Sequence, residues 1–79
     1  MSHTPHELRE EFPEFVDRIH ELKVSDAHFH RISEEYHTIN RQIHRAEIGE
    51  DHLSSLDEED LRKRRMLLKD EIYGFLKAK

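Results

Sequence analysis

Residues 26–48, DAHFHRISEEYHTINRQIHRAEI, decide the fold of this chain. Apolar side chains recur there at alternating spacings of three and four, which keeps them on one face of an α-helix for about five turns. That face consists of Phe29, Ile32, Tyr36, Ile39, Ile43 and Ala46. Ser25 and Asp26 offer an N-cap, and Gly49 suits the position that ends a helix. We therefore expect one long helix over residues 26–48.

A second amphipathic stretch, LDEEDLRKRRMLLKDEIYGFLKA, occupies residues 56–78. Ser55 or Asp57 can cap it, so the helix should begin within residues 55–57. Residues 49–55 lack a sustained period and are expected to form the loop between the two helices. The apolar stripe of the second helix comprises Leu61, Leu68, Ile72, Phe75 and Leu76.

Two helices of equal length joined by a short loop pack economically as an antiparallel pair. If the loop centres near residue 52, the numbers of partner residues sum to roughly 104. This register places the two apolar stripes opposite each other along their whole length. The sequence thus predicts an all-α fold, an antiparallel helical hairpin within a single domain over residues 1–79. Its predicted core is Phe29, Ile32, Tyr36, Ile39, Ile43, Leu61, Leu68, Ile72 and Phe75.

The segment over residues 4–24 is predicted to be a shorter helix that begins after a capping box at Thr4 and is kinked by Pro13. Its own apolar stripe has no partner in a straight hairpin. Either the segment folds back as a third helix, or it docks onto another copy or another protein. The second alternative makes the stripe an interface for self-association or for a helical partner. The stripe consists of Phe12, Phe15, Ile19 and Leu22.

Composition narrows the class of protein. The chain has 79 residues, of which 34% are hydrophobic and 39% charged, which allows one small domain with a thin core. It has no cysteine, so disulfides cannot supply stability. A formal net charge of −5 creates no global attraction for nucleic acid or anionic lipid. Without a signal-peptide pattern or a membrane-spanning apolar run, we expect a cytoplasmic protein with no membrane association.

Histidine-rich and basic stretches raise two further hypotheses. His30, Glu34 and His37 share one helical face, but a solvated flank explains them better than a metal site, because positions seven apart lie about 10 Å apart along the axis. A metal- or pH-responsive regulator is therefore an alternative, and no metal ligand is assigned. The basic run at residues 62–65 follows the acids at 58–60 by four residues, the spacing of self-paired charges on a helix.

The basic run leaves weak nucleic-acid binding as the third hypothesis. Arg65 has no acid four residues earlier, and its head group is expected to meet Glu35 of the first hairpin helix. No nucleophile motif, glycine-rich phosphate loop or cofactor fingerprint occurs, so we expect no catalytic residue and no cofactor. The sequence alone therefore favours a non-enzymatic module for protein–protein interaction or self-association.

A family resemblance covers residues 12–76 and rests on a set of positions between Phe12 and Ile72. They are Phe12-Pro13-Glu14, Ile19, Leu22-Lys23, Asp26, His28-Phe29, Tyr36, Asn40, Ile43, Glu47 and Leu68-Lys69-Asp70-Glu71-Ile72. In these positions the chain resembles the YdcH-like proteins, a bacterial family of short chains of unknown function. The resemblance implies a helical hairpin and a bacterial cytoplasmic origin, and it brings no activity. Residues 2–11 look like an extension.

Overall fold

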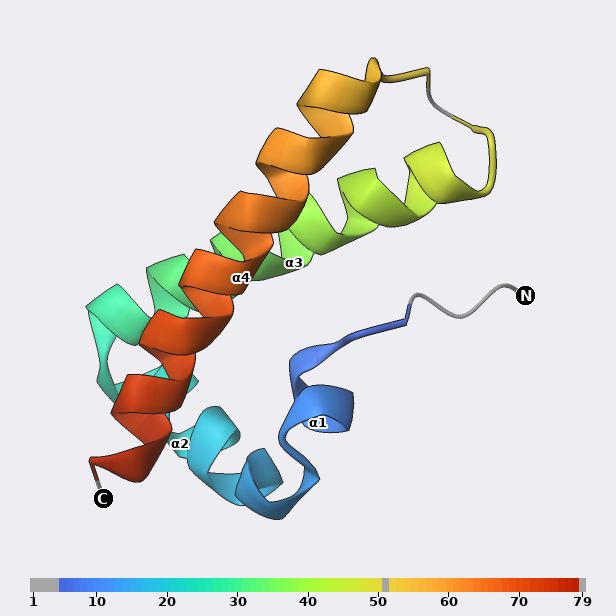
Figure 1. The fold of residues 1–79 in the computed structure, drawn as a ribbon. Helices are drawn as coiled ribbons and strands as arrows, with labels where there is room; N and C mark the ends of the chain where they lie inside the picture. Colours follow the sequence, from blue (N-terminus) through green and yellow to red (C-terminus); the bar gives the residue numbers. More distant parts are fainter. Residues whose placement is uncertain (1–4, 51, 79) are drawn as a thin grey trace.

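The computed structural model describes residues 5–50 and 52–78, and within these ranges the chain is all-α, with no strand (Figure 1). Two long helices dominate, and three shorter elements precede them. The elements are α1 (Leu8–Glu11), the 3₁₀ turn η1 (Pro13–Phe15), α2 (Val16–Ser25), α3 (Ala27–Glu47) and α4 (Ser55–Lys77).

Helix α3 begins and ends close to the predicted limits of residues 26 and 48. At its start, the Asp26 carboxylate accepts a hydrogen bond from the Phe29 N–H at 3.0 Å, which satisfies one of the open donors of the first turn. Beyond its end, Gly49 adopts a φ of 85°, a left-handed conformation in which a Cβ atom is costly. The local signals in the sequence therefore mark both ends of this helix.

Helix α4 begins at Ser55, but its cap is neither of the two expected residues. The Ser54 hydroxyl accepts a hydrogen bond from the Asp57 N–H at 3.0 Å. Ser54 and Ser55 are chemically identical, and the backbone places the first of them at the non-helical cap position. The predicted start within residues 55–57 agrees with the structure, whereas the prediction of Ser55 or Asp57 as the capping residue was wrong.

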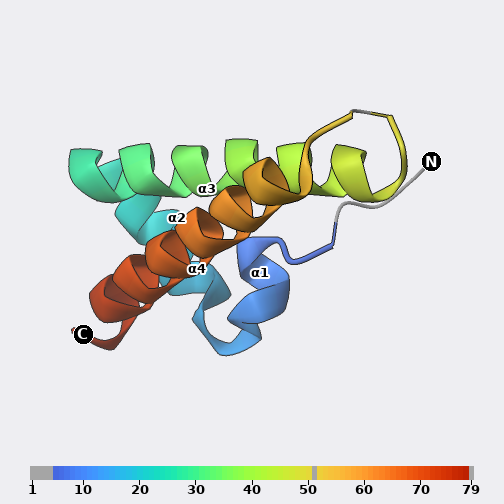
Figure 2. The ribbon, with the colours of Figure 1, turned by 45° about the horizontal axis from the view of Figure 1, so that its top comes forward.

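The two long helices form the predicted antiparallel hairpin and cross at an acute angle (Figure 2). Near the start of α3, the rings of Phe29 and Phe75 pack edge to face with their centroids 5.5 Å apart, as the predicted register requires. Near its end, Glu47 forms an ion pair with Arg62 at 3.2 Å. The structure buries Phe29, Ile32, Tyr36, Ile39, Ile43, Leu68 and Ile72, with Leu61 and Phe75 partly buried against them.

The N-terminal segment takes the first of its two alternatives and folds back onto the hairpin (Figures 1 and 2). The predicted cap Thr4 lies outside the described residues, and residues 5–7 are not helical. The first helix instead begins at Leu8, after a capping box that joins Glu7 and Glu10. Pro13 interrupts the segment as expected, because it opens a 3₁₀ turn between α1 and α2.

The stripe predicted as an interface packs within the chain, which is the first of the two predicted alternatives. Phe12 and Ile19 are 8% and 7% exposed, and Phe15 and Leu22 pack against the buried cluster. Figure 2 shows α1 and α2 together on one side of the crossing helices α3 and α4, and burying apolar side chains against the hairpin there is favourable. The chain therefore supplies its own partner for this stripe.

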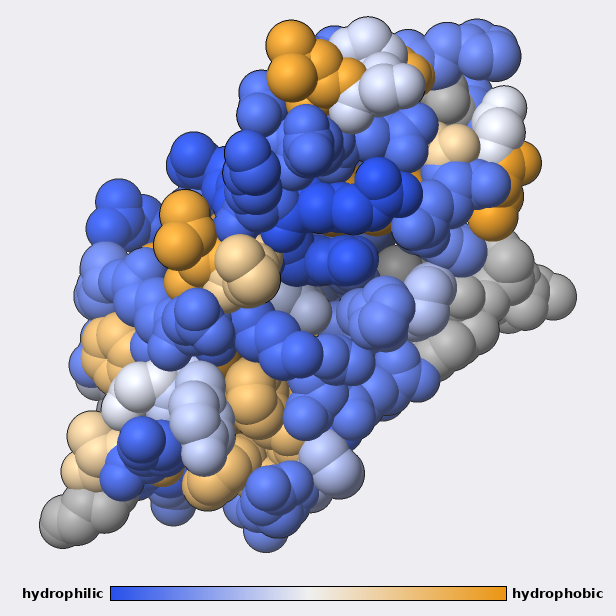
Figure 3. All heavy atoms as spheres, viewed as in Figure 1, coloured by the Kyte–Doolittle hydropathy of each residue, from blue (hydrophilic) through white to orange (hydrophobic). Residues whose placement is uncertain are grey.

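The surface is mainly hydrophilic, with small apolar areas set apart from one another on the face of Figure 3. Val24, Leu56 and Leu67 are among the exposed apolar residues. Within residues 5–50 and 52–78, none of the helices combines the length and the apolar character needed to cross a membrane.

Candidate functional site

The most distinctive polar site lies where the N-terminal arm, residues 5–12, meets the hairpin. Tyr36 and Asn40, one helical turn apart on α3, are each 1% exposed. The Tyr36 hydroxyl donates a hydrogen bond to the His6 carbonyl at 2.7 Å, and the Asn40 Nδ2 donates one to the Pro5 carbonyl at 2.7 Å. Two buried side chains of α3 thus bind the backbone, not the side chains, of the arm.

Helix α4 orients the asparagine. Arg65 donates from Nη1 to Asn40 Oδ1 at 2.9 Å. Because arginine has only donors, this contact identifies the amide oxygen and leaves the amide NH₂ to face the Pro5 carbonyl. Arg65 was expected to meet Glu35, but that acid binds its neighbour Arg64 instead. Successive residues on a helix point about 100° apart, so the two arginines reach different sides of α3.

Charged contacts complete the site. Lys69 of α4 binds the Glu11 carboxylate, and its Nζ lies 5.8 Å from the centre of the Phe12 ring. His6 Nδ1 approaches the second Glu11 oxygen at 3.2 Å. The hydrogen bond from Lys69 lowers the pKa of Glu11, with a smaller contribution from His6, against the opposing effect of burial. We call Tyr36, Asn40, Arg65 and Lys69 the receptor face.

The hydroxyl of Tyr36 stays protonated over the whole physiological range. Burial raises the pKa of Tyr36 to about 12, and the nearby Glu11 carboxylate acts in the same direction. A neutral hydroxyl can donate to a carbonyl, whereas a phenolate cannot. The receptor face therefore holds a fixed pair of donors for two successive carbonyl groups.

The arm presents its backbone in an unusual conformation. His6 has a φ of 64°, in the left-handed region, and Glu7 then returns to an extended conformation before α1. This turn directs the carbonyls of residues 5 and 6 to α3 and brings Leu8, which is 2% exposed, into the core. On the far side of the arm, Glu7 Oε1 lies 2.8 Å from His37 Nδ1.

The histidine face predicted from the sequence is divided in the structure. His37 faces the arm through Glu7, while His30 and Glu34 are exposed. In the part of the chain that the structure describes, no group of three or more His, Asp or Glu side chains is arranged to hold a metal ion. His37 therefore belongs to the arm contacts.

The three arginines of the basic run at residues 62–65 make contacts within the protein, whereas Lys63 is exposed. Arg62 pairs with Glu58 at 3.3 Å, the predicted spacing of four, and also with Glu47 of α3. Arg64 binds Glu35, and Arg65 binds Asn40. The contacts with Glu47, Glu35 and Asn40 join α4 to α3, so these arginines help to hold the hairpin together.

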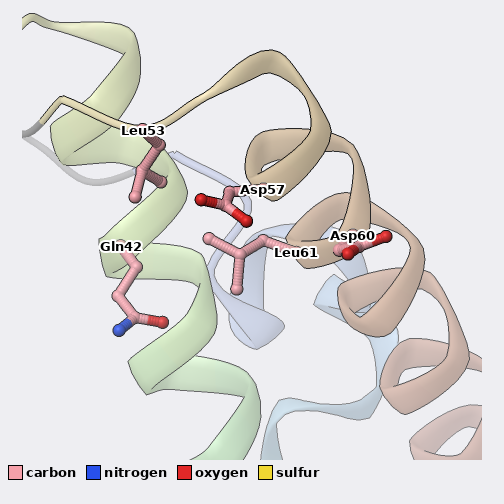
Figure 4. A pocket seen from close by; sticks show the side chains of 5 residues that line it. All are labelled: Gln42, Leu53, Asp57, Asp60 and Leu61. Carbon is pink, nitrogen blue, oxygen red and sulfur yellow. The ribbon is translucent and has the colours of Figure 1, made fainter.

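A hollow of about 310 Å³ lies between the end of α3 and the start of α4 (Figure 4). Gln42 comes from α3, Leu53 from the loop, and the other lining residues from α4. Asp57 and Asp60 are exposed, as solvated carboxylates usually are. This hollow lies at the loop end of the hairpin and contains none of the receptor face.

Sequence reasoning missed the receptor face, although two signals pointed to it. Asn40 is a polar residue one turn after Tyr36, on the flank of a stripe that is otherwise apolar. Leu8 extends the stripe of the N-terminal segment by one more step of four residues before Phe12. A buried amide such as that of Asn40 needs a hydrogen-bond partner. An additional apolar side chain such as Leu8 needs a surface against which it can pack.

Comparison with known proteins identifies a family for the hairpin. A family described as a protein of unknown function, DUF465, matches residues 29–76, from the first turn of α3 almost to the end of α4. Searches of curated proteins and of solved structures found no match. The matched span includes the whole receptor face and excludes the N-terminal arm. The resemblance stated from the sequence covered residues 12–76, and the match bears it out over residues 29–76. Because the match covers more than half of the sequence, the chain belongs to the DUF465 family, the YdcH-like proteins of unknown function.

Proposed function

We propose that this protein is a non-enzymatic protein-interaction module whose hairpin binds a peptide segment. The segment it fits has a non-helical stretch followed by a helical turn with two apolar residues four apart. Within the chain, residues 5–12 fill that role. The observation that carries the proposal is the pair of buried donors, Tyr36 and Asn40, bound to consecutive backbone carbonyls.

Separate groups at the site hold the backbone of the segment and select its side chains, which supports this proposal. Hydrogen bonds to backbone carbonyls hold a segment whatever its side chains are, as in other modes of peptide recognition. Selectivity then comes from the apolar anchors, Leu8 and Phe12, and from the charge pair between Glu11 and Lys69. An acidic residue just before the second anchor therefore favours binding.

The extent of the family match supports the proposal as well. Residues 29–76 contain the receptor face, whereas the arm lies outside them. A hairpin that carries buried donors on one side needs an acceptor there, since an unsatisfied buried polar group is costly. A peptide segment supplies these acceptors, from the same chain or from another one.

The proposal is tested with full-length protein whose own arm is weakened by Leu8→Ala. An isotope-labelled sample is titrated with a synthetic peptide of residues 5–25, and the side-chain NH₂ signals of Asn40 are followed by NMR. We expect a saturable shift, because the weakened arm competes less well for the receptor face. A matched peptide carrying Leu8→Asp and Phe12→Asp should produce no shift.

A folded Leu8→Ala protein that ignores the native peptide at millimolar concentration would contradict the proposal. Glu11→Gln is the second weakened variant. It lies on the arm, keeps the apolar anchors and the whole receptor face, and weakens only the contacts of Glu11 with Lys69 and His6, which the added peptide can still make.

A further inference from the structure

We infer that two copies of this chain exchange their N-terminal segments, residues 5–25, so that the segment of each copy fills the receptor face of the other. The partner is thus a second copy of the same chain. The inference rests on the proposed function, because it requires the segment to behave as a ligand of the hairpin. It adds to that proposal the residue at which the segment swings away from the hairpin and the number of chains in the assembly, which is two.

The hinge is a single residue. Helix α2 ends at Ser25 and α3 begins at Ala27, so only Asp26 separates them. Asp26 has an extended backbone, with φ −129° and ψ 110°, and its N–H already donates to the Leu22 carbonyl at 2.9 Å. Rotation at this one residue into the helical region would join α2 and α3 into one continuous helix.

Two features hold the hinge in its bent form. One is the cap itself, in which the Asp26 carboxylate accepts from the Phe29 N–H. The other is the packing of Ile19 and the arm against the hairpin. Only the cap is lost on straightening if a second copy restores the packing, since every contact of the segment is then remade with identical residues.

A straightened chain cannot easily fill its own receptor face. The joined helix over residues 16–47 would be about 48 Å long, longer than the largest dimension of the closed molecule, 39 Å. Tyr36 lies about 15 Å beyond the hinge in one direction, and Val16 would lie about 15 Å from it in the other. The eleven residues from His6 to Val16 span the roughly 30 Å between Val16 and Tyr36 only if α1 and η1 unwind.

The geometry therefore leaves two closed arrangements, a monomer with a bent hinge and a dimer with two straight ones. Short hinge segments are a known route to such exchange. The exchanged dimer needs no new kind of contact at the receptor face, because the arm of one copy fits the receptor face of the other as it fits its own. Concentration and the hinge residue decide between the two arrangements.

The first experiment measures sedimentation of full-length hinge variants over a range of concentrations. Asp26→Ala removes the cap and favours a continuous helix, so we expect the dissociation constant of the dimer to fall about thirtyfold, roughly fivefold for each of its two hinges. Asp26→Ser is the matched control. It keeps a capping side chain and should resemble the wild type within about threefold.

The second experiment identifies the exchanged contact by charge reversal at Glu11 and Lys69, in chains that also carry Asp26→Ala. Glu11→Lys and Lys69→Glu each place like charges together, whether in a monomer or in a homodimer. Only an exchanged heterodimer restores both pairs. One chain is labelled with ¹⁵N, and native mass spectrometry at low salt should show heterodimers in clear excess over the statistical half of all dimers.

Three results would overturn the inference: no dimer of Asp26→Ala at the highest concentration reached, equal dimerisation of Asp26→Ala and Asp26→Ser, or a statistical mixture of charge-reversed dimers. If Asp26→Ala fails to fold, charge-reversed chains with the natural hinge are unfolded and refolded together at high concentration. The formation of dimers and the share of heterodimers among them are then judged in the same way.

Peptide binding without a dimer removes the exchange alone and leaves the proposed function. Failed peptide binding removes the proposed function itself.

Discussion

Arg65 donates a hydrogen bond to Asn40 Oδ1 at 2.9 Å, and in doing so it turns the Asn40 amide nitrogen toward the Pro5 carbonyl. One buried asparagine thus connects α4, α3 and the N-terminal arm. A buried polar group of this kind is favourable only while each of its partners is in place. The asparagine should therefore contribute more to stability than its size suggests.

Asn40→Ala is expected to lower the free energy of unfolding by about 2 kcal/mol, because it leaves the Pro5 carbonyl and the Arg65 guanidinium without their partner. Urea denaturation followed by circular dichroism measures the change. Thr38→Ala is the control on the same helix. Thr38 is exposed and bonds only to the Glu34 carbonyl of its own helix, so its loss should stay within about 0.5 kcal/mol. Equal losses in the two variants would contradict the role given to Asn40.

Tyr36→Phe keeps the buried ring and removes the hydrogen bond to the His6 carbonyl, at an expected cost of about 1 kcal/mol near neutral pH. The wild type should also lose stability in alkali through this residue. The pKa of Tyr36 is raised to about 12 in the folded state, against 10.0 for the ordinary group, so its contribution is present below pH 10 and is lost as the pH rises toward 12.

The alkaline decline is measured as the difference in unfolding free energy between the wild type and Tyr36→Phe from pH 9 to pH 12. This difference cancels the titration of the lysines, which both proteins share. It should shrink as the pH rises above 10. A constant difference would show that Tyr36 does not ionise with an altered pKa.

The hairpin could be predicted from the sequence because its determinants are local and repeated. The apolar stripe of α3, the cap at Asp26 and the left-handed Gly49 each act within a few residues. The register followed from matching two stripes over many turns, and the contact between Phe29 and Phe75 confirms it. Such redundancy makes a prediction robust to error at any one residue.

The destination of the N-terminal segment could not be predicted, because the same apolar stripe can pack on its own hairpin or on another chain. The choice depends on how α3 and α4 cross and on two hydrogen bonds whose acceptors are backbone carbonyls. Asn40 marks a buried donor in the sequence, but a backbone acceptor leaves no pattern that identifies it. The partner of Glu35 was missed for a related reason. Arg64 and Arg65 are adjacent, and the rotation of α4 decides which one reaches the acid.

His6 offers a test of the backbone conformation of the arm. Its φ of 64° is unfavourable for a residue with a Cβ atom and accessible to glycine. We expect His6→Gly to be about 1 kcal/mol more stable than His6→Ala. Both variants lose the contact with Glu11, so the comparison isolates the backbone. Thermal or urea denaturation of the two variants side by side measures it, and equal stability would argue against a left-handed residue at this position.

Glu11→Gln should destabilise the protein at pH 7, and this loss should shrink as the pH falls below 4.5. The hydrogen bond from Lys69 lowers the pKa of Glu11 in the folded state, so its contribution is present above the ordinary value of 4.5 and disappears as the pH falls through the folded value. Because the pair is partly solvated, the loss at pH 7 should be below about 1 kcal/mol. Glu14→Gln, at an exposed position, is the matched control for the loss of one carboxylate, and it should destabilise the protein less at pH 7.

Phe15→Asp distinguishes an intramolecular role of the N-terminal stripe from an intermolecular one. The Phe15 ring contacts Phe12 and Tyr73, with centroid separations of 6.5 and 6.4 Å. A carboxylate there would lose these contacts and be partly desolvated, so we expect the free energy of unfolding to fall by about 2 kcal/mol. Val16→Asp, at a neighbouring position that is 45% exposed, should cost well under half as much. Both are measured in dilute solution, where self-association is negligible. A Phe15→Asp protein as stable as the wild type under these conditions would show that the stripe packs chiefly against another molecule.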